Sequence, residues 1–584
     1  MTNKGSSMSR SQLLAASAAL LLALRAGAAE PKKDAPPVDA GVEALIKQAV
    51  DKAKQELRDE LRVETQNAQS AAAFMGTAAE GPKLQLLELD GYLRLRGNLF
   101  DNLGVHRKVD TNGVYLVARP GDAEGRGTQT SSNLRLRLEP TLNVSEHVRV
   151  RGGVDVLDNY VLGTSGQAVW GGASPTDRAA VNVRRAWGEV ETPLGLISFG
   201  RMPDAFGLGL VRASFDGLDD DWGDSRDRLQ FAAYPVSTPI GMLSLVPFLD
   251  FDAEGPLQDD PRQGAGTGQP FAKDPNYDGR TWGFKVLRLD TEDELRRKLA
   301  GGQPSHNYGG IYSYSTLGRV VNPYYQVTGA VARSDKQDVR RREYRHQVDL
   351  WYRYRTSRLT LEVEATGLLG QIGDPGMYSA GLDYTGPKVL MHQAGGAARI
   401  TYQVTPGKVA MGGELGLASG DSAPGFGNDP GQLNAAGTLP VYGAAEGPQY
   451  GCRTSGRCDR TIDNLRFNPG YRVDMILWRE ILGQVTDAWY LKPTMRWDIV
   501  AGLAYDLQLV YSQAIYASST PSASSASTGH RSLGVEWDNK LTYSTDDGFA
   551  AWLQYGVLFP LDGFNGAGAT TRAHAIRAGL AVKF

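Results

Sequence analysis

The stretch Asn133-Leu-Arg-Leu-Arg-Leu-Glu139 is followed, after Ser145-Glu146-His147, by Val148-Arg-Val-Arg-Gly-Gly-Val-Asp-Val156. In both runs apolar residues alternate with polar or charged ones, the period of two that is typical of a β-strand. The short polar segment between the runs is a turn signal. These residues therefore predict an antiparallel hairpin that turns at Glu146.

The hairpin also predicts specific cross-strand neighbours. Residues equally distant from Glu146 along the chain face each other, so Arg137 is expected opposite Asp155, and Glu139 diagonal to Arg151. All four charged side chains then lie on the same face of the sheet. A structure that placed Arg137 on the apolar face would contradict the strand assignment itself.

The same alternation recurs from residue 84 to residue 584, and the connections between the predicted strands alternate in length. The short connections lie near 145–147, 193–195, 236–239, 356–357, 405–407 and 545–548. The long connections, rich in Gly, Asp and Ser, lie near 102–130, 162–179, 205–225, 254–279, 319–343, 373–387, 420–470 and 518–530. A soluble β-sandwich also shows alternation but has no reason to segregate its connections, whereas an outer-membrane barrel has short periplasmic turns and long external loops.

The predicted fold is therefore a transmembrane antiparallel β-barrel. Counting strands gives 18, within a range of 16 to 20, and an even number is what single-chain bacterial barrels have. A short helix from Glu292 to Leu299, capped by Asp290 or Thr291, is expected in place of one turn. A barrel of this size leaves an aqueous lumen.

Composition excludes several other classes of protein. The chain has 584 residues, of which 41% are hydrophobic, 70 are glycine and 25 are tyrosine. Apart from one short N-terminal run it has no long apolar stretch, which excludes a polytopic helical membrane protein. A net charge of −3 gives no sign of a general nucleic-acid binder.

The N-terminal region predicts export. Lys4 and Arg10 precede an apolar run at 13–24 and the small residues Ala26-Gly27-Ala28, a pattern typical of a secretory signal peptide over residues 1–28. Residues 29–83 then predict a linker and an amphipathic periplasmic helix. Two interpretations of that helix stay open: it folds back on its own protein, or it self-associates as a coiled coil.

The C-terminal residues point to the outer membrane of a Gram-negative bacterium. They place an apolar side chain at every second position: Ile576, Ala578, Leu580, Val582 and Phe584. This pattern resembles the signal read by the outer-membrane barrel assembly machinery. The alternative is an edge strand of a soluble protein that ends in phenylalanine by chance.

Several strings resemble porins. Arg185-Ala-Trp-Gly-Glu-Val-Glu191, followed by Leu196-Ile-Ser-Phe-Gly-Arg201, resembles the strand-turn-strand unit with a Gly-Arg ending that recurs in porins. Residues 417–427 and 471–480 are similar to signatures of an uncharacterised porin-like family found in myxobacteria. The resemblance covers roughly residues 84–584. It implies the fold and the membrane, and it assigns neither a substrate nor functional residues.

The alternation also predicts which charges face the lumen. An Arg or Lys at the lipid midplane costs roughly 2–4 kcal/mol, so the leucines of 133–139 are expected to face lipid and the charges to face inward. The residues expected to line the pore are Arg94, Arg96, Arg135, Arg137, Glu139, Arg149, Arg151, Asp155, Asp349, Arg353, Glu362 and Glu364. Arginines facing acids across a pore can orient polar solutes. The alternative is that these charges only solvate the interior.

Residues Tyr471–Gly483 predict a different element. Val473, Ile476, Leu477 and Ile481 are spaced closer to a helical period than to a period of two, and Gly483 supplies a helix stop. We expect this segment to pack on the inner wall and to narrow the barrel. Its charged residues are expected to point into the lumen and form a constriction: Arg472, Asp474, Arg479 and Glu480. The alternative is an ordinary strand.

Two further groups of residues lie in long loops. Cys452 and Cys458 close a small loop and predict a structural disulfide, which is favoured over a metal site because no histidine lies nearby. An acidic cluster could bind calcium but lacks the spacing of a calcium loop, so a solvated external loop is expected there. Its members are Asp219, Asp220, Asp221, Asp224 and Asp227.

Taken as a sequence, the chain predicts an outer-membrane, porin-like channel for the passive diffusion of small polar solutes, with no cofactor. The oligomeric state stays open, with a homotrimer among the options. One alternative is an export barrel for a secreted polysaccharide. Another is a barrel enzyme, which would need a Ser/His or Asp/His pair at the same depth along the barrel axis. No such pair can be assembled from the sequence.

Overall fold

The computed structural model describes residues 86–103, 127–161, 181–214, 216–221, 223–239, 241–253, 257–258, 271–272, 278–321, 338–373, 388–422, 461–520, 529–563 and 571–584. The predicted signal peptide, the linker and helix within 29–83, and Cys452 and Cys458 lie outside these residues. Within the described part of the chain, no helix has the length and apolar character needed to cross a membrane.

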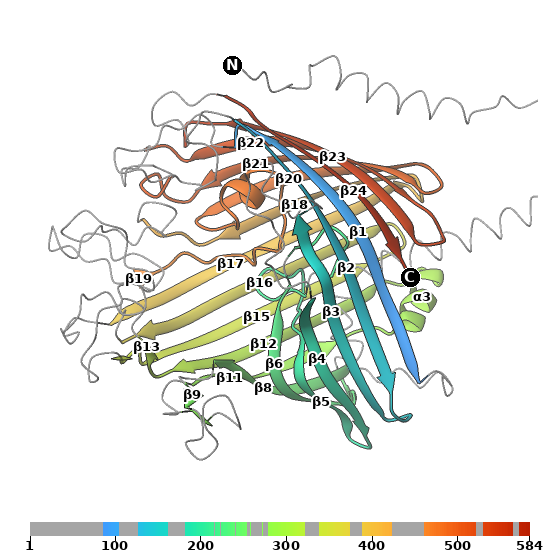
Figure 1. Cartoon of the computed structure of the whole chain (residues 1–584), viewed down its shortest axis with the longest axis vertical. Coiled ribbons are helices and arrows are strands. Elements are labelled where there is room, and N and C mark those ends of the chain that lie inside the picture. The colour runs from blue at the N-terminus through green and yellow to red at the C-terminus, as the bar shows by residue number, and fades with distance from the viewer. Residues whose placement is uncertain are drawn as a thin grey trace, which may run out of the picture. The chain divides into compact units, whose positions relative to one another are not determined.

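Eighteen long strands form one closed antiparallel barrel (Figure 1). β1 pairs with β2 on one side and with β24 on the other, which closes the ring. This confirms the predicted fold and the even strand number. The barrel strands are β1 (Leu87–Asp101), β2 (Thr128–Asn143), β3 (Val148–Val161), β4 (Val181–Thr192), β5 (Gly195–Pro203), β6 (Ser225–Ala233), β8 (Gly241–Ala253), β11 (Gly279–Arg288), β12 (Ser305–Leu317), β15 (Glu343–Arg355), β16 (Leu359–Ile372), β17 (Val389–Thr405), β18 (Val409–Ala418), β20 (Ala488–Val500), β21 (Leu503–Ala514), β22 (Ser532–Ser544), β23 (Phe549–Pro560) and β24 (Ala573–Lys583).

Smaller elements sit in the connections. The helix α3 (Glu292–Ala300) confirms the predicted helix between β11 and β12, and a capping box starts it: the Thr291 hydroxyl accepts from the Glu294 amide, and the Glu294 carboxylate accepts from the Thr291 amide. The short strands are β7 (Val236–Thr238), β9 (Leu257–Gln258), β10 (Phe271–Ala272), β13 (Val320–Val321), β14 (Asp338–Val339) and β19 (Thr461–Ile462).

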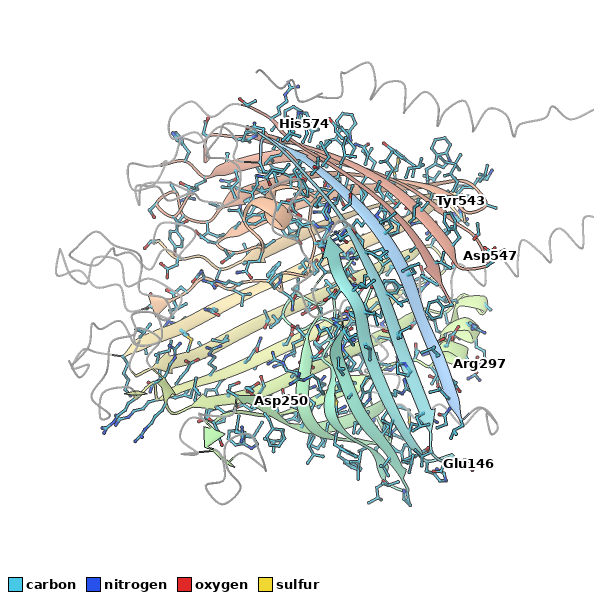
Figure 2. All side chains as sticks on the ribbon, viewed as in Figure 1. Glu146, Asp250, Arg297, Tyr543, Asp547 and His574 are labelled. Atoms are coloured by element: carbon cyan, nitrogen blue, oxygen red, sulfur yellow. The ribbon has the colours of Figure 1, made fainter. Side chains whose placement is uncertain are left out.

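Short connections gather at one end of the barrel. Figure 2 places Glu146 of the β2–β3 turn, Arg297 of α3 and Asp547 of the β22–β23 turn at that end, and His574 at the start of β24 at the opposite end. The segregation of connections that the sequence predicted is therefore present. It is the arrangement expected of a barrel inserted into a membrane from one side.

The wall has its apolar side chains outside and its charges inside. On β1, Leu93 and Leu95 are 43% and 39% exposed, whereas Arg94 between them is completely buried. Trp282 and Tyr314 stack on the outer surface of β11 and β12. A soluble barrel would reverse this polarity, because its outer surface meets water. An apolar exterior around charged interior residues is the signature of a barrel that spans a membrane.

The predicted hairpin register is confirmed. Arg137 pairs with Asp155 across β2 and β3, and Arg151 stands opposite Thr141, which leaves Glu139 diagonal to Arg151. The Arg137 Nε–Asp155 Oδ1 distance is 2.7 Å, and both residues are buried. The register shifts between Leu134 and Leu136, a local irregularity that the alternation did not predict.

Glycines make room for aromatic rings on neighbouring strands. Gly579 stands opposite Trp552, and a Cβ on this glycine would lie 2.0 Å from the indole ring. At the seam, Gly91 and Phe584 exchange backbone hydrogen bonds of 3.0 and 3.1 Å, and the Phe584 ring lies over the glycine. Such pairs cover a backbone that lacks a side chain and fix the register of adjacent strands.

Candidate functional site

Two segments leave the wall and fold into the barrel. We call residues 204–224, between β5 and β6, the first inward segment, and residues 463–487, before β20, the second inward segment. Leu210 of the first and Phe467 and Trp478 of the second belong to one buried hydrophobic cluster. Inward-facing wall residues complete that cluster: Phe100, Ala397, Ala418, Tyr490, Val510, Leu533, Leu558 and Ala575. This sector of the interior is therefore a packed core rather than water-filled space.

The second inward segment is not a strand. It contains a π-helical turn, Leu477–Ile481, in which Leu477 and Trp478 are almost fully buried. The Trp478 indole donates to the Ser512 hydroxyl on the inner face of β21 at 2.9 Å. Gly483 follows the turn with φ 83°, a conformation that favours glycine. These observations confirm the prediction of a non-strand element packed on the inner wall.

Asp474 differs from its prediction. It was expected to point into the lumen, but its side chain is buried and accepts hydrogen bonds from the amides of Trp478 at 2.9 Å and Arg479 at 3.2 Å. It therefore caps the π-helical turn, whose first amides have no partner within the turn. Burial raises the pKa of Asp474 to about 8, and the nearby carboxylate of Asp538 adds to this.

A second buried acid anchors this turn to the wall. Glu536, on β22, accepts hydrogen bonds from the amides of Met475, Ile476 and Leu477 at 2.9, 2.7 and 2.9 Å. A carboxylate at the start of a helical turn satisfies amides that would otherwise be buried without a partner. Glu536 therefore fixes the second inward segment to the barrel wall.

A matching acid holds the first inward segment. Glu364, on β16, is completely buried and accepts from the amides of Gly209 at 3.0 Å and Leu210 at 3.5 Å. Its neighbour Asp349 is also buried, and Glu362 accepts from the Trp351 indole at 2.8 Å. The sequence predicted that these acids face arginines across open water. Instead they lie beneath the first inward segment or against the wall.

The base of the first inward segment is an ionic cluster. The completely buried Asp204 lies 2.8 Å from Arg228, 3.1 Å from Arg212 and 3.2 Å from Lys285. Burial by itself would raise the pKa of Asp204, but the positive charges of Arg228, Lys285 and Arg212 hold it well below its usual value. The segment therefore starts from a fixed point on the wall.

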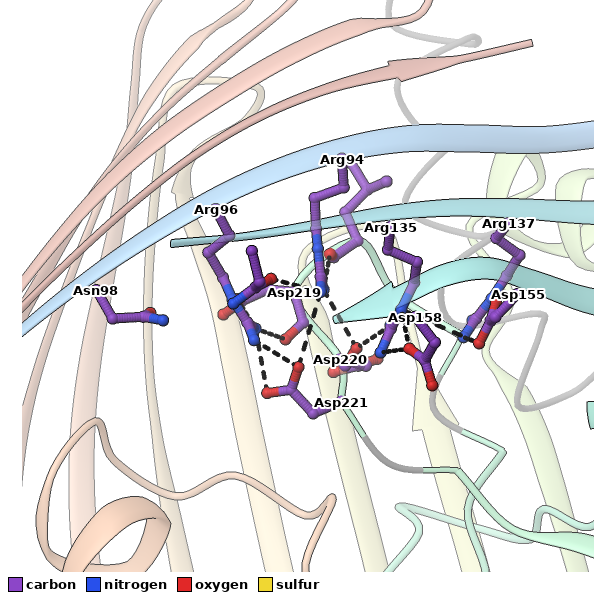
Figure 3. A network of polar contacts seen from close by, with 12 residues as sticks. Arg94, Arg96, Asn98, Arg135, Arg137, Asp155, Asp158, Asp219, Asp220 and Asp221 are labelled. Atoms are coloured by element: carbon purple, nitrogen blue, oxygen red, sulfur yellow. Dashed lines mark hydrogen bonds and ion pairs between the residues drawn. The ribbon is translucent and has the colours of Figure 1, made fainter. Parts of the chain in front are cut away.

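The tip of the first inward segment reaches the opposite wall. Figure 3 shows Arg94 and Arg96 of β1 and Arg135 of β2 directed towards Asp219–Asp221. Arg96 lies 2.6 Å from Asp221 and 3.1 Å from Asp219, and Arg135 donates to the Asp220 carbonyl at 2.7 Å. Because β1 and β16 stand on opposite sides of the ring, the first inward segment crosses the lumen between Glu364 and these arginines.

The second inward segment contacts the same three aspartates. Arg472 lies 3.3 Å from Asp219 and 3.1 Å from Asp221, and Arg479 lies 3.2 Å from Asp219. Burial would raise the pKa of Asp219, but Arg479 and Arg472 hold it well below its usual value. Glu480 forms a close ion pair with Arg577 on β24. We call the pairs between Asp219–Asp221 and Arg94, Arg96, Arg135, Arg472 and Arg479 the arginine–aspartate network.

The acidic cluster is therefore not the solvated external loop that the sequence predicted. Asp219, Asp220 and Asp221 lie inside the barrel among arginines, and only Asp227, on β6, pairs at the rim, with Arg201 at 2.7 Å. Within the described residues, no group of three or more His, Cys, Asp or Glu side chains is placed to hold a metal ion.

Some predicted pore residues lie away from this network. Arg151 pairs with Glu189 at 3.1 Å, and the Arg353 guanidinium lies over the Trp351 ring. Arg149 and Glu139 are half-buried near the short-turn end. These residues face inward as predicted, and Arg151 and Arg353 contact side chains of the wall.

Sequence reasoning missed the anchoring residues Glu536 and Asp204, and it also missed contacts of Asp216 and Glu480 with the wall. Arg185 lies 2.7 Å from Asp216 of the first inward segment, which also contacts Arg137 at 3.3 Å, and Arg577 holds Glu480. The alternation contained a signal for Arg577, since it occupies an inward position between Ile576 and Ala578. Asp216 carried no such signal, because it lies in a loop.

Comparisons with known proteins find similar barrels among solved structures. Neither a protein-family model nor a curated protein matches the sequence. Pseudomonas aeruginosa OccK11 (OpdR) is similar over 85% of this chain and 96% of its own, at 12% identity and a TM-score of 0.41. A BenF-like porin from Pseudomonas fluorescens Pf-5 is similar over 85% and 99%, at 10% identity and a TM-score of 0.41. OmpT, an outer membrane protein of Vibrio cholerae, is similar over 87% and 100%, at 10% identity and a TM-score of 0.34. Because these values are low, we infer function from the residues of this chain alone.

Proposed function

We propose that the protein is an outer-membrane channel through which small polar solutes diffuse passively, and that its two inward segments set the width of the passage. The observation that carries the proposal is the first inward segment, which crosses a charged lumen from Glu364 to Arg96. A barrel whose interior served only as a core would be expected to fill it with apolar side chains.

The size and chemistry of the barrel support this proposal. Rings of 16 to 18 strands commonly leave an aqueous channel. Inward-facing charges near the short-turn end are open to solvent: the side chains of Arg496, Asp498 and Asp506 are 42%, 40% and 34% exposed. Water therefore reaches the inner wall at the short-turn end, and charged groups there can interact with a polar solute.

Single-channel recording in a planar bilayer tests the proposal. We expect the purified, folded barrel to insert and give stepwise ionic currents. Folding is checked separately by the shift in gel mobility of the unheated protein. Absence of current from the folded wild type, and also from variants with a weakened arginine–aspartate network, would overturn the proposed function.

A further inference from the structure

We propose that Asp219–Asp221 act as a latch: their ion pairs with Arg472 and Arg479 hold the tip of the first inward segment, residues 216–221, against the second in a narrow state. Loss of these pairs lets the tip move away and widens the passage, while the hydrophobic cluster around Leu210 stays packed. This inference rests on the proposed channel function. It concerns how the width of the passage is regulated.

Each inward segment has its own attachment to the wall. Glu364 and the Asp204 cluster hold the first, and Glu536 holds the second. Glu364 and Glu536 are at most 1% exposed. Breaking these contacts would leave several backbone amides buried without a partner, so the attachments are expected to persist when the tip moves.

The contact between the segments has two parts: Leu210 packs in the buried hydrophobic cluster, whereas the tip of the first segment meets the second through ion pairs. The side chains of Asp219, Asp221 and Arg472 are 18%, 21% and 17% exposed and that of Arg479 is 8% exposed, so water reaches the aspartate side of these pairs. Beside them, Asn468 donates from its backbone to the Leu210 carbonyl and from its side chain to Asp224, at 2.6 Å each. Ion pairs within reach of water are weaker than buried ones. The arginine–aspartate network is therefore the part of the assembly that opens most readily.

The charges also predict how the open state differs from the narrow one. Five arginines surround the three aspartates: Arg94, Arg96 and Arg135 from the wall, and Arg472 and Arg479 from the second inward segment. When the aspartates leave, these cations face the passage without their partners. The open state should therefore favour anions more strongly than the narrow state does.

The test is a double-mutant cycle in the full-length protein. Asp219→Asn, Arg479→Gln and the double variant are recorded in planar bilayers beside the wild type. Asp219 pairs with Arg96, Arg472 and Arg479, and Arg479 also pairs with Asp221, so each single variant weakens more than one ion pair. We therefore expect each to raise the ratio of open to narrow dwell times by about fivefold or more. Because the Asp219–Arg479 pair is lost in both, the double variant should change the ratio by less than the two single effects combined.

A matched control and a second measurement separate a latch from general damage. Asp227→Asn also removes an aspartate but breaks only the rim pair with Arg201, so it should leave the dwell times unchanged. Asp219→Asn should also shift the reversal potential in a salt gradient towards anions. Current from the wild type with no change in either variant would overturn the latch and leave the channel function intact. Silence from every folded variant would instead overturn the proposed function.

Discussion

The carboxylate of Glu536 on the barrel wall accepts the backbone N–H of Ile476 at 2.7 Å, in the middle of three consecutive amides that it binds. This contact fixes the position of the second inward segment, because those amides start a turn and have no partners within it. A buried wall acid is therefore used here to hold backbone rather than to face water.

Replacing Glu536 should destabilise the inward segment. Glu536→Gln keeps one acceptor oxygen but puts an NH2 group in place of the other, so at least one of the three amides loses its partner. We expect a loss of about 1–3 kcal/mol in the free energy of unfolding. The free energy of unfolding is measured by urea titration in detergent, with tryptophan fluorescence as the signal. This signal reports on the segment because Trp478 lies in it. Glu146→Gln, at the exposed turn, is the matched control and should change nothing. Equal stability of the two variants would contradict the anchoring role.

Glu364→Leu should loosen the first inward segment. The amides of Gly209 and Leu210 would lose their acceptor and be buried without a partner, at a cost of about 1–3 kcal/mol each. We expect faster cleavage of residues 204–224 by an added protease, with the barrel strands intact on the gel. Cleavage at the wild-type rate would show that the Glu364 contact does not hold this segment.

Alkaline pH should destabilise the second inward segment. Burial raises the pKa of Asp474 and of Asp487 to about 8, with Asp538 and Asp421 respectively adding to the shift. Both acids are thus favoured in the neutral form, so their contribution to stability is complete below the unfolded value near 3.8 and is lost as the pH rises through 8. Amide hydrogen exchange of residues 463–487, corrected for intrinsic rates, should show less protection at pH 9 than at about pH 6. Asp474→Asn should reduce this pH dependence, and an unchanged profile in that variant would exclude Asp474 as its source.

Gly579 should tolerate no side chain while Trp552 is present. A Cβ at this position would lie 2.0 Å from the indole, so Gly579→Ala forces the ring or the strand to move, at a cost of about 1–3 kcal/mol. Gly97→Ala on β1 is the control, because its nearest contact would be an ordinary 3.7 Å. Samples of each folded barrel are heated to a series of temperatures before electrophoresis. The temperature at which the gel-mobility shift is lost measures the difference in stability. If Trp552→Leu fails to relieve the Gly579→Ala defect, the clash is not its cause.

The disulfide between Cys452 and Cys458 stays a prediction. Because the closed loop is short, its stabilisation should fall at the low end of roughly 2–4 kcal/mol. Alkylation of the folded, unreduced protein should label neither cysteine, and labelling after reduction should modify both. Two reactive thiols before reduction would contradict the bond.

The sequence by itself determined the barrel, because strand alternation and turn signals are local. The pattern around Glu146 was enough to place Arg137 opposite Asp155, and the spacing at Tyr471–Gly483 favoured a non-strand element there over the alternative of a strand. Each of these inferences depends on residues that lie close together along the chain. The two-residue period also assigned Arg94 and Arg135 to the inner face.

Only the tertiary structure decided what the inward charges contact. Asp219 and Arg479 are 260 residues apart, and no local pattern links an aspartate-rich loop to a distant arginine. Taken alone, three adjacent aspartates predict a solvated loop, because like charges repel and are hydrated. The closed ring changes this outcome by bringing arginines from β1, β2 and the second inward segment to one place in the lumen, where their combined charge favours buried carboxylates.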